Sequence, residues 1–307
     1  MIPQIAADPG SSTPAAARTL WGDAWRRFCR DRLALVGGFI LLLILVGCLI
    51  GPWIYTVPVD EIDFARSSQG PSWAHPFGTN DLGQDVLARV LAGGRISLVV
   101  GVISMLVAMT FGTLVGALAG FYGGWVDLLL MRFTDLFLSL PQLPLLLLVI
   151  FLFREGMRSL AGPEMGIFLL IVLVIGGLTW MPVARLVRAS TLSLREMEFV
   201  LAARTIGAPP HRLIWVHILP NVLSPVIVAA ALSVGTAILT ESTLSFLGLG
   251  FPPDVPTWGR LLHDARNYLE SAPHMALFPG LAIFITVLSI NYVGDGLRDA
   301  LDPRVRQ

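Results

Sequence analysis

Six apolar stretches dominate the pattern of hydrophobic and polar positions along the chain, and none of them contains Asp, Glu, Lys or Arg. Each holds close to the roughly 20 residues that a helix needs to cross about 30 Å of hydrocarbon. Lipid offers no partner for backbone N–H and C=O groups, so helices are expected. The pattern predicts an all-α membrane protein with six transmembrane helices, over residues 33–57, 97–119, 136–153, 165–183, 222–240 and 275–294.

Composition agrees with a bilayer environment. Of the 307 residues, 55% are apolar and 14% are charged, and the mean hydropathy of +0.74 exceeds that of ordinary soluble domains. Pro141 and Pro144 near the start of the third span indicate a kink, which is tolerated where neighbouring helices bond the freed carbonyls. The two cysteines, Cys29 and Cys48, support neither a disulfide framework nor a thiolate metal site.

The arginines predict the orientation, since all 21 basic residues are arginine. With the N-terminus inside, 14 of them fall in cytoplasmic segments and 7 on the other side. Both termini are therefore expected in the cytoplasm. Residues 1–32 would form a cytoplasmic tail, of which residues 1–20 lack an apolar period, and residues 33–307 the membrane domain. The run from Leu33 is too long for a signal peptide, and no cleavage site follows it.

Several chemistries are excluded by the residue types present. A nucleotide-binding P-loop needs a lysine, and the chain has none, so we do not expect it to hydrolyse ATP. The five histidines form no i, i+4 pair and no H-E-x-x-H motif, so no metal site is expected. No nucleophile motif such as G-x-S-x-G occurs, so no catalytic residue is assigned. Scattered arginines that set topology argue against nucleic acid as a partner.

A long segment, residues 184–220, connects the fourth and fifth predicted spans on the cytoplasmic side. Good helix formers extend to Thr205, and Gly207 followed by two prolines ends the pattern. We predict a helix, a turn and a second short helix. Ala203 and Gly207 are four residues apart, with Ala202 beside them, which predicts a face of small residues that another backbone can approach closely. Spacing alone leaves open an ordinary alanine-rich connector.

Several motifs resemble one family. The run AARTIGA, followed by HILPN at 217–221, resembles the "EAA" loop of importer permeases in the ATP-binding-cassette (ABC) superfamily. The runs HPFGTNDLGQDVLARVLAGGRISL (75–98), GFYGGWVDLLLMRFTDLFLSLP (120–141), ESTLSFLGLG (241–250) and GDGLRDALDPR (294–304) are similar to its peptide-permease branch, second-subunit type. The resemblance covers the chain from about residue 20 to the end.

The resemblance implies that residues 184–220 carry a coupling helix, which inserts into a groove on an ATPase subunit. The residues that it assigns to coupling are Glu198, Ala202, Ala203, Gly207, His217 and Pro220. Leu201 stands where the family has Glu, so an acidic contact at that position is not carried over. Glu198, about one turn earlier, is either its replacement or a solvated charge on the helix face.

The resemblance also implies a fold, a location and partners. It implies the type I permease fold of ABC importers in the bacterial inner membrane. The implied partners are a second, related permease, two ATPase subunits that hold Mg-ATP, and an extracytoplasmic substrate-binding protein. The chain itself would be a non-catalytic subunit without a cofactor, and would import short peptides by alternating access. Glutathione or nickel is the alternative cargo. A secondary transporter is the rival class, but the charges that couple ions are absent from the predicted spans.

Four residues are candidates for contact with cargo or with the binding protein. Glu241 and Ser245 follow the fifth predicted span, where an ionisable group faces the bundle interior or water, so they are candidates for the translocation path. A carboxylate that bridges helices is an equal alternative. Trp258 and Asp264 are candidates for the contact with the binding protein, although Trp258 also suits the interfacial aromatic belt. A structural ion-pair network is expected in the cytoplasmic turn before the third span, formed by Asp127, Arg132 and Asp135.

Overall fold

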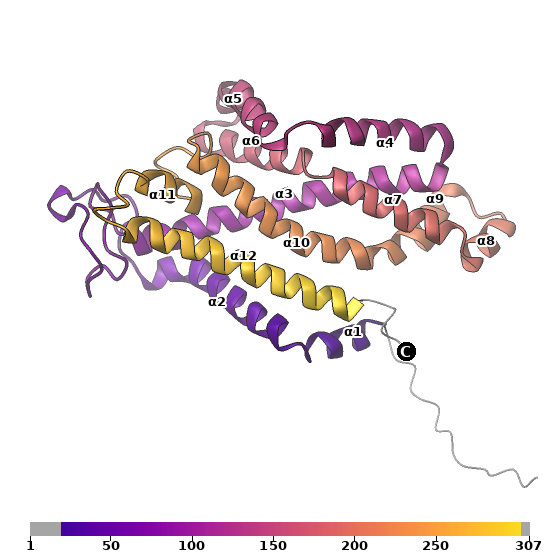
Figure 1. Ribbon diagram of the computed structural model, residues 1–307, viewed down its shortest axis with the longest axis horizontal. Coiled ribbons are helices and arrows are strands. Elements are labelled where there is room, and N and C mark those ends of the chain that lie inside the picture. Colours follow the sequence, from indigo (N-terminus) through magenta and orange to yellow (C-terminus); the bar gives the residue numbers. More distant parts are fainter. Residues whose placement is uncertain (1–19, 302–307) are drawn as a thin grey trace, which may run out of the picture.

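A computed structural model gives the structure of the chain and describes residues 20–301. The secondary-structure elements of the described part are helices, and residues 55–85 are mostly irregular (Figure 1). In chain order they are α1 (Leu20–Phe28), α2 (Arg32–Ile54), η1 (Phe64–Arg66), α3 (Val86–Tyr122), α4 (Gly124–Ser139), α5 (Gln142–Ala161), α6 (Pro163–Gly177), α7 (Met181–Arg195), α8 (Glu198–Thr205), α9 (Pro210–Arg212), the π-helical η2 (Leu213–Ile218), α10 (Leu219–Phe246), α11 (Trp258–Ala265) and α12 (His274–Leu301).

Within residues 20–301, four helical stretches are long and apolar enough to cross a membrane without a break: α2, α3, the stretch Pro210–Phe246 and α12. Two bent pairs, α4 with α5 and α6 with α7, add two more crossings if each pair is one span. The prediction of an all-α membrane protein is confirmed. Up to six crossings result, which is the predicted number.

The third predicted span is broken rather than kinked. Helices α4 and α5 meet at 90°. Pro141 has no N–H and disfavours helical geometry at the residue before it, and Leu140 accordingly adopts an extended conformation with ψ 141°. The fourth predicted span is also interrupted, because α6 and α7 meet at 41° around residues 178–180. The sequence pattern located both apolar stretches but not the extent of these breaks.

Helix α3 begins at Val86, well before the start predicted near Ser97. The prediction treated the charges of Arg89 and Arg95 as the limit of the apolar stretch. In the structure Arg95 donates two hydrogen bonds of 2.6 Å to the carbonyls of Cys48 and Leu49 on α2. The charge is thereby bonded to the neighbouring helix and does not end α3.

A seam of glycines joins α3 to α7. Gly112, Gly116 and Gly120 recur every fourth residue and lie on one face of α3. A Cβ at Gly116 would lie 2.4 Å from the carbonyl oxygen of Ala184, and a Cβ at Gly120 would lie 2.7 Å from the Cβ of Thr191. Small residues at this spacing let two helices approach closely, which is how helices associate where lipid removes the hydrophobic driving force.

The two ends of the bundle are built differently (Figure 1). The α8 end carries α1, α8, the turn between α3 and α4, and the last turn of α12, whereas the α11 end carries residues 55–85 and α11. Helix α1 lies within the segment predicted as a tail, and residues 1–19 of that segment lie outside the described residues. Since α1 and the end of α12 share one side, the crossings are even in number. That this side is cytoplasmic stays a prediction from the arginines.

Candidate functional site

Helix α8 ends in a tight turn centred on Gly207. Gly207 has a φ of 86°, a conformation that favours glycine. The N–H of Ala208 donates to the carbonyl of Ala203 at 3.1 Å, and the N–H of Gly207 donates to that of Arg204 at 3.0 Å. This pair of bonds is a Schellman motif. The predicted break at Gly207 is confirmed, and the chain returns from it toward α10.

One face of α8 is packed and the other is exposed. Val200 and Ala203 are buried in a core cluster that also contains residues of α7, η2 and α10. The outward face carries Glu198 and Ala202, and Ile206 beyond the end of the helix is 86% exposed. Phe199 and Leu201 are exposed beside them. An apolar surface of this kind at the end of a bundle is typical of a protein contact.

The structure divides the six residues assigned to coupling. Ala203 faces the core, and Gly207 lies in the turn beyond α8, so the predicted shared face of small residues is wrong: the helix ends at Thr205, before the second member of the pair. His217 lies in η2, where its carbonyl accepts a bond of 2.7 Å from Asn221, and Pro220 lies in the first turn of α10. Of the six, Glu198, Ala202, Gly207 and Pro220 are exposed, and Glu198 and Ala202 form the outward face of α8 beside Ile206.

Ion pairs join α4 to α7. Both carboxylate oxygens of Asp127 accept bonds from Arg188, one of them at 2.6 Å, and Asp135 pairs with Arg185 at 2.5 Å. A structural network was predicted here, but within a turn and with Arg132. Both acids instead lie within α4, and the partners come from α7, because the 90° bend turns α4 along that helix.

Glu241 forms a buried link between α3 and α10. Its side chain is 0% exposed, and its carboxylate accepts bonds from Ser97 at 3.1 Å and from Ser245 at 2.7 Å. Ser97 also accepts the backbone N–H of Trp258 at 3.3 Å, so α11 joins the same link. Glu241 is therefore a carboxylate that bridges helices, the alternative to a residue of the translocation path. Glu241 and Ser245 do not line an open path in this structure, because α3 covers that side of α10.

A cavity of about 450 Å³ lies instead along another face of α10. Its lining comes from α4, α5, α7 and α10 and contains no Asp, Glu, Lys or Arg. Ser233, Thr236 and Thr240 contribute hydroxyls, and each of them donates to a carbonyl of its own helix. The wall is thus apolar with weakly polar positions. Sequence patterns did not indicate it, because its residues meet only through the bend between α4 and α5.

Trp258 and Asp264 both lie in α11 but differ in exposure. Trp258 is 0% exposed, and its indole N–H donates to the carbonyl of Val90 at 3.0 Å, so its side chain packs α11 on α3 and reaches neither a partner nor the lipid interface. Asp264 remains accessible and pairs with Arg260 at 2.8 Å. The aromatic belt failed as an interpretation because residues 55–85 and α11 cover this end of the bundle.

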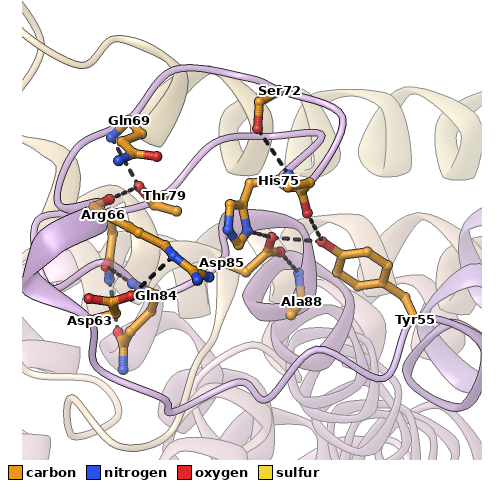
Figure 2. A network of polar contacts seen from close by, with 12 residues as sticks. Tyr55, Asp63, Arg66, Gln69, Ser72, His75, Thr79, Gln84, Asp85 and Ala88 are labelled. Carbon is orange, nitrogen blue, oxygen red and sulfur yellow. Dashed lines mark hydrogen bonds and ion pairs between the residues drawn. The ribbon is translucent and has the colours of Figure 1, made fainter.

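A polar network at the α11 end was not predicted (Figure 2). The carboxylate of Asp85 accepts the N–H of Ala88 at 2.7 Å, which caps α3, and the hydroxyl of Tyr55 at 2.7 Å, and it lies 2.8 Å from Nδ1 of His75. The carbonyl of Thr79 contacts His274 of α12 at 3.0 Å. Residues 55–85 are thereby fixed to the ends of α2, α3 and α12. The available signal was an aspartate directly before an apolar helix, the position of an N-cap.

Helices that cross a membrane up to six times within the described residues define a multi-pass membrane protein. The family of binding-protein-dependent transport system inner membrane components matches residues 112–307. The N-terminal transmembrane domain of oligopeptide transport permease C matches residues 19–71. The chain belongs to this family of inner-membrane transport components, and it is a permease subunit of an ABC transporter.

Similar curated proteins cover nearly the whole chain. A glutathione transport system permease protein of Pectobacterium atrosepticum is 40% identical, over 95% of this chain and 93% of its own length. A dipeptide transport system permease protein of Alkalihalophilus pseudofirmus is 38% identical, over 99% and 97%. An oligopeptide transport system permease protein of Haemophilus influenzae is 40% identical, over 94% and 90%. Membership in this family implies, in general terms, ATPase and substrate-binding partners.

Proposed function

We propose that the chain is the non-catalytic half of a pathway that imports short peptides across the bacterial inner membrane. A second, related permease would form the other half, two ATPase subunits would bind Mg-ATP, and a binding protein would deliver the peptide. The observation that carries this proposal is the likeness to a dipeptide permease over 99% of the chain and 97% of the relative. The proposed ATPase contact is the outward face of α8.

The packing of α8 supports a mechanical link from that contact to the cavity. Val200 and Ala203 share one buried cluster with residues of α7 and α10, and α7 and α10 line the 450 Å³ cavity. Close-packed interiors transmit displacement because they hold few voids. A partner that shifts α8 would therefore shift two walls of the cavity together, as alternating access requires.

The chemistry of the cavity suits a cargo of varied side chains. Without charged groups in its lining, the wall offers no strong site for one particular peptide. The hydroxyls of Thr236 and Thr240 are engaged by their own helix, so they hold passing groups weakly. Conduction requires such weak binding, because a tight site would retain the cargo.

The coupling surface is tested with Ile206→Glu, which places a charge at an 86% exposed position without disturbing the core. We expect loss of co-purification with the ATPase subunits and loss of ATP-dependent uptake. The matched control is Leu269→Glu, an exposed leucine near the α11 end, which should leave ATPase assembly unchanged. Gly207 is less suitable, since substitution there also strains the turn. Undiminished assembly and uptake of the Ile206 variant would exclude α8 as the contact.

The substrate class is tested with the complete transporter in proteoliposomes. Radiolabelled dialanine should accumulate with ATP and binding protein present, and excess unlabelled dipeptide should compete. Glutathione is the second candidate, because one relative of 40% identity is a glutathione permease. Accumulation of glutathione that dialanine does not inhibit would replace the peptide assignment. Accumulation without ATPase subunits would remove the proposed function.

A further inference from the structure

A pocket of about 530 Å³ lies at the α11 end, between the segment of residues 60–89 and α11. It differs from the α10 cavity in being strongly charged. Arg89, Gln84 and Asn80 form a buried floor, and each is less than a tenth exposed. Asp60 and Asp254 line the same pocket from exposed positions. The pocket lies within the range of small-ligand sites, about 300–1,000 Å³.

Arg89 is a buried cation that no carboxylate of the described residues contacts, and the charges of Asp264, Asp60 and Asp81 act on it only from beyond contact distance. Its residue is 3% exposed, and no carboxylate of residues 20–301 lies within 4.0 Å of it. The guanidinium donates through Nη1 to Gln84 and through Nη2 to the carbonyl of Pro253 at 3.3 Å, both of which are neutral acceptors. Its Nε has no partner in the described part. Buried charges in proteins are normally paired in direct contact, so this floor lacks an anionic group that touches Arg89.

The exposed rim of the pocket carries charges of both signs. Asp60 and Asp254 form no ion pair in the part of the chain that the structure describes. The other two acids of the lining are already engaged: Asp264 pairs with Arg260 at 2.8 Å, and Asp81 accepts from the Tyr268 hydroxyl at 3.4 Å. Arg266 is a further exposed member of the lining and forms no ion pair in the described residues, so the rim carries two unpaired acids and one unpaired cation. The floor carries the positive charge of Arg89, which no carboxylate contacts.

We propose that this pocket binds a small zwitterion with a free carboxylate and a free ammonium group, namely a short peptide on its way into the transporter. The inference rests on the proposed peptide import and gives that cargo a site on the outer surface of the permease. The carboxylate meets the Arg89 floor, and the ammonium group meets Asp60 and Asp254. A single acidic side chain of a docking protein would fill only part of the volume and would leave the rim acids unpaired.

The first test measures direct binding, by calorimetry, to the assembled permeases and ATPases in nanodiscs without binding protein or nucleotide. The probes are trialanine, trialanine amide, which lacks the carboxylate, and N-acetyl-trialanine, which lacks the ammonium. Each modified probe should bind about tenfold more weakly or worse, since each loses a charge-assisted hydrogen bond. Equal affinity for the three probes would overturn the proposal.

The second test assigns the ammonium to the rim. The double variant Asp60→Asn with Asp254→Asn should weaken trialanine about tenfold and leave N-acetyl-trialanine unchanged. The matched control is Glu61→Gln, an exposed neighbour outside the pocket, which should bind all probes as the wild type does. A rim variant that binds trialanine normally but binds the binding protein more weakly would overturn the proposal in favour of protein docking.

The third test assigns the carboxylate to the floor. Arg89→Gln should remove the preference for trialanine over its amide. If this buried substitution prevents assembly, the rim variants decide the question alone. Uptake by the complete transporter distinguishes a failure of the pocket proposal from a failure of the proposed peptide import. Normal peptide uptake without direct trialanine binding removes the pocket and leaves the proposed function, whereas absence of peptide uptake removes the proposed function.

Discussion

The glycine seam between α3 and α7 makes a sharp prediction about the variant Gly116→Ala. A Cβ at this position would lie 2.4 Å from the Ala184 carbonyl oxygen, 2.7 Å from the Val187 Cβ and 3.0 Å from the Arg188 backbone nitrogen. None of these atoms can move by side-chain rotation, because all three are backbone or Cβ atoms. The methyl group can be accommodated only if the two helices separate.

The magnitude follows from two opposing terms. Overpacking a tight contact costs about 1–3 kcal/mol, and the rigid neighbours place this site in the upper part of that range. Replacing glycine by alanine in a helix gains up to about 1 kcal/mol. The net loss of unfolding free energy at Gly116 is therefore about 1–2 kcal/mol. Separation would also loosen the contacts of Gly112 and Gly120 in the same seam.

The matched control is Gly156→Ala in α5, where a Cβ would meet no atom within 4 Å. The same chemical change should there stabilise the protein by up to about 1 kcal/mol. Equilibrium unfolding of the purified permease in mixed detergent, followed by circular dichroism, measures both variants. If Gly116→Ala proved as stable as Gly156→Ala, the α3–α7 contact would not be as close as the structure has it.

Three further predictions concern polar contacts. Asp127→Asn and Arg188→Gln in a double-mutant cycle should give a coupling of about 1 kcal/mol for this partly exposed pair, and additive losses would show that it does not hold α4 to α7. Glu241→Ala should cost about 1–3 kcal/mol by leaving buried hydroxyls without an acceptor, whereas Glu241→Gln keeps an acceptor and should retain stability and uptake; a large loss of uptake in stable Glu241→Gln would restore a transport role. The negative charge of Asp81, with smaller contributions from desolvation and the hydrogen bond, raises the pKa of Tyr268 above its usual value of about 10. The stability that this contact contributes is present below about pH 10 and is lost as the pH rises through the raised pKa, so a spectrophotometric titration of Asp81→Asn should show one tyrosine ionising at lower pH than in the wild type.

Features that depend on local chemistry could be predicted from the sequence. The apolar stretches indicated the crossings because backbone groups in lipid must bond within a helix, and this holds for each stretch separately. Gly207 marked the end of α8, because few residues other than glycine adopt its backbone conformation. Pro141 marked the place where α4 and α5 part, although the pattern could not show that the bend reaches 90°. The family resemblance followed from motifs that are contiguous in the chain.

Features that depend on packing between distant segments were decided only by the tertiary structure. Glu241 and Ser245 are covered because α3 lies against that face of α10, and no local pattern reveals which face a neighbour covers. Trp258 is buried for the same reason, against the carbonyl of Val90 far away in the chain. The buried charge of Arg89 is intelligible only beside Gln84 and the carbonyl of Pro253. Burial is a property of what surrounds a residue, and the surroundings form when helices that are remote in sequence pack together.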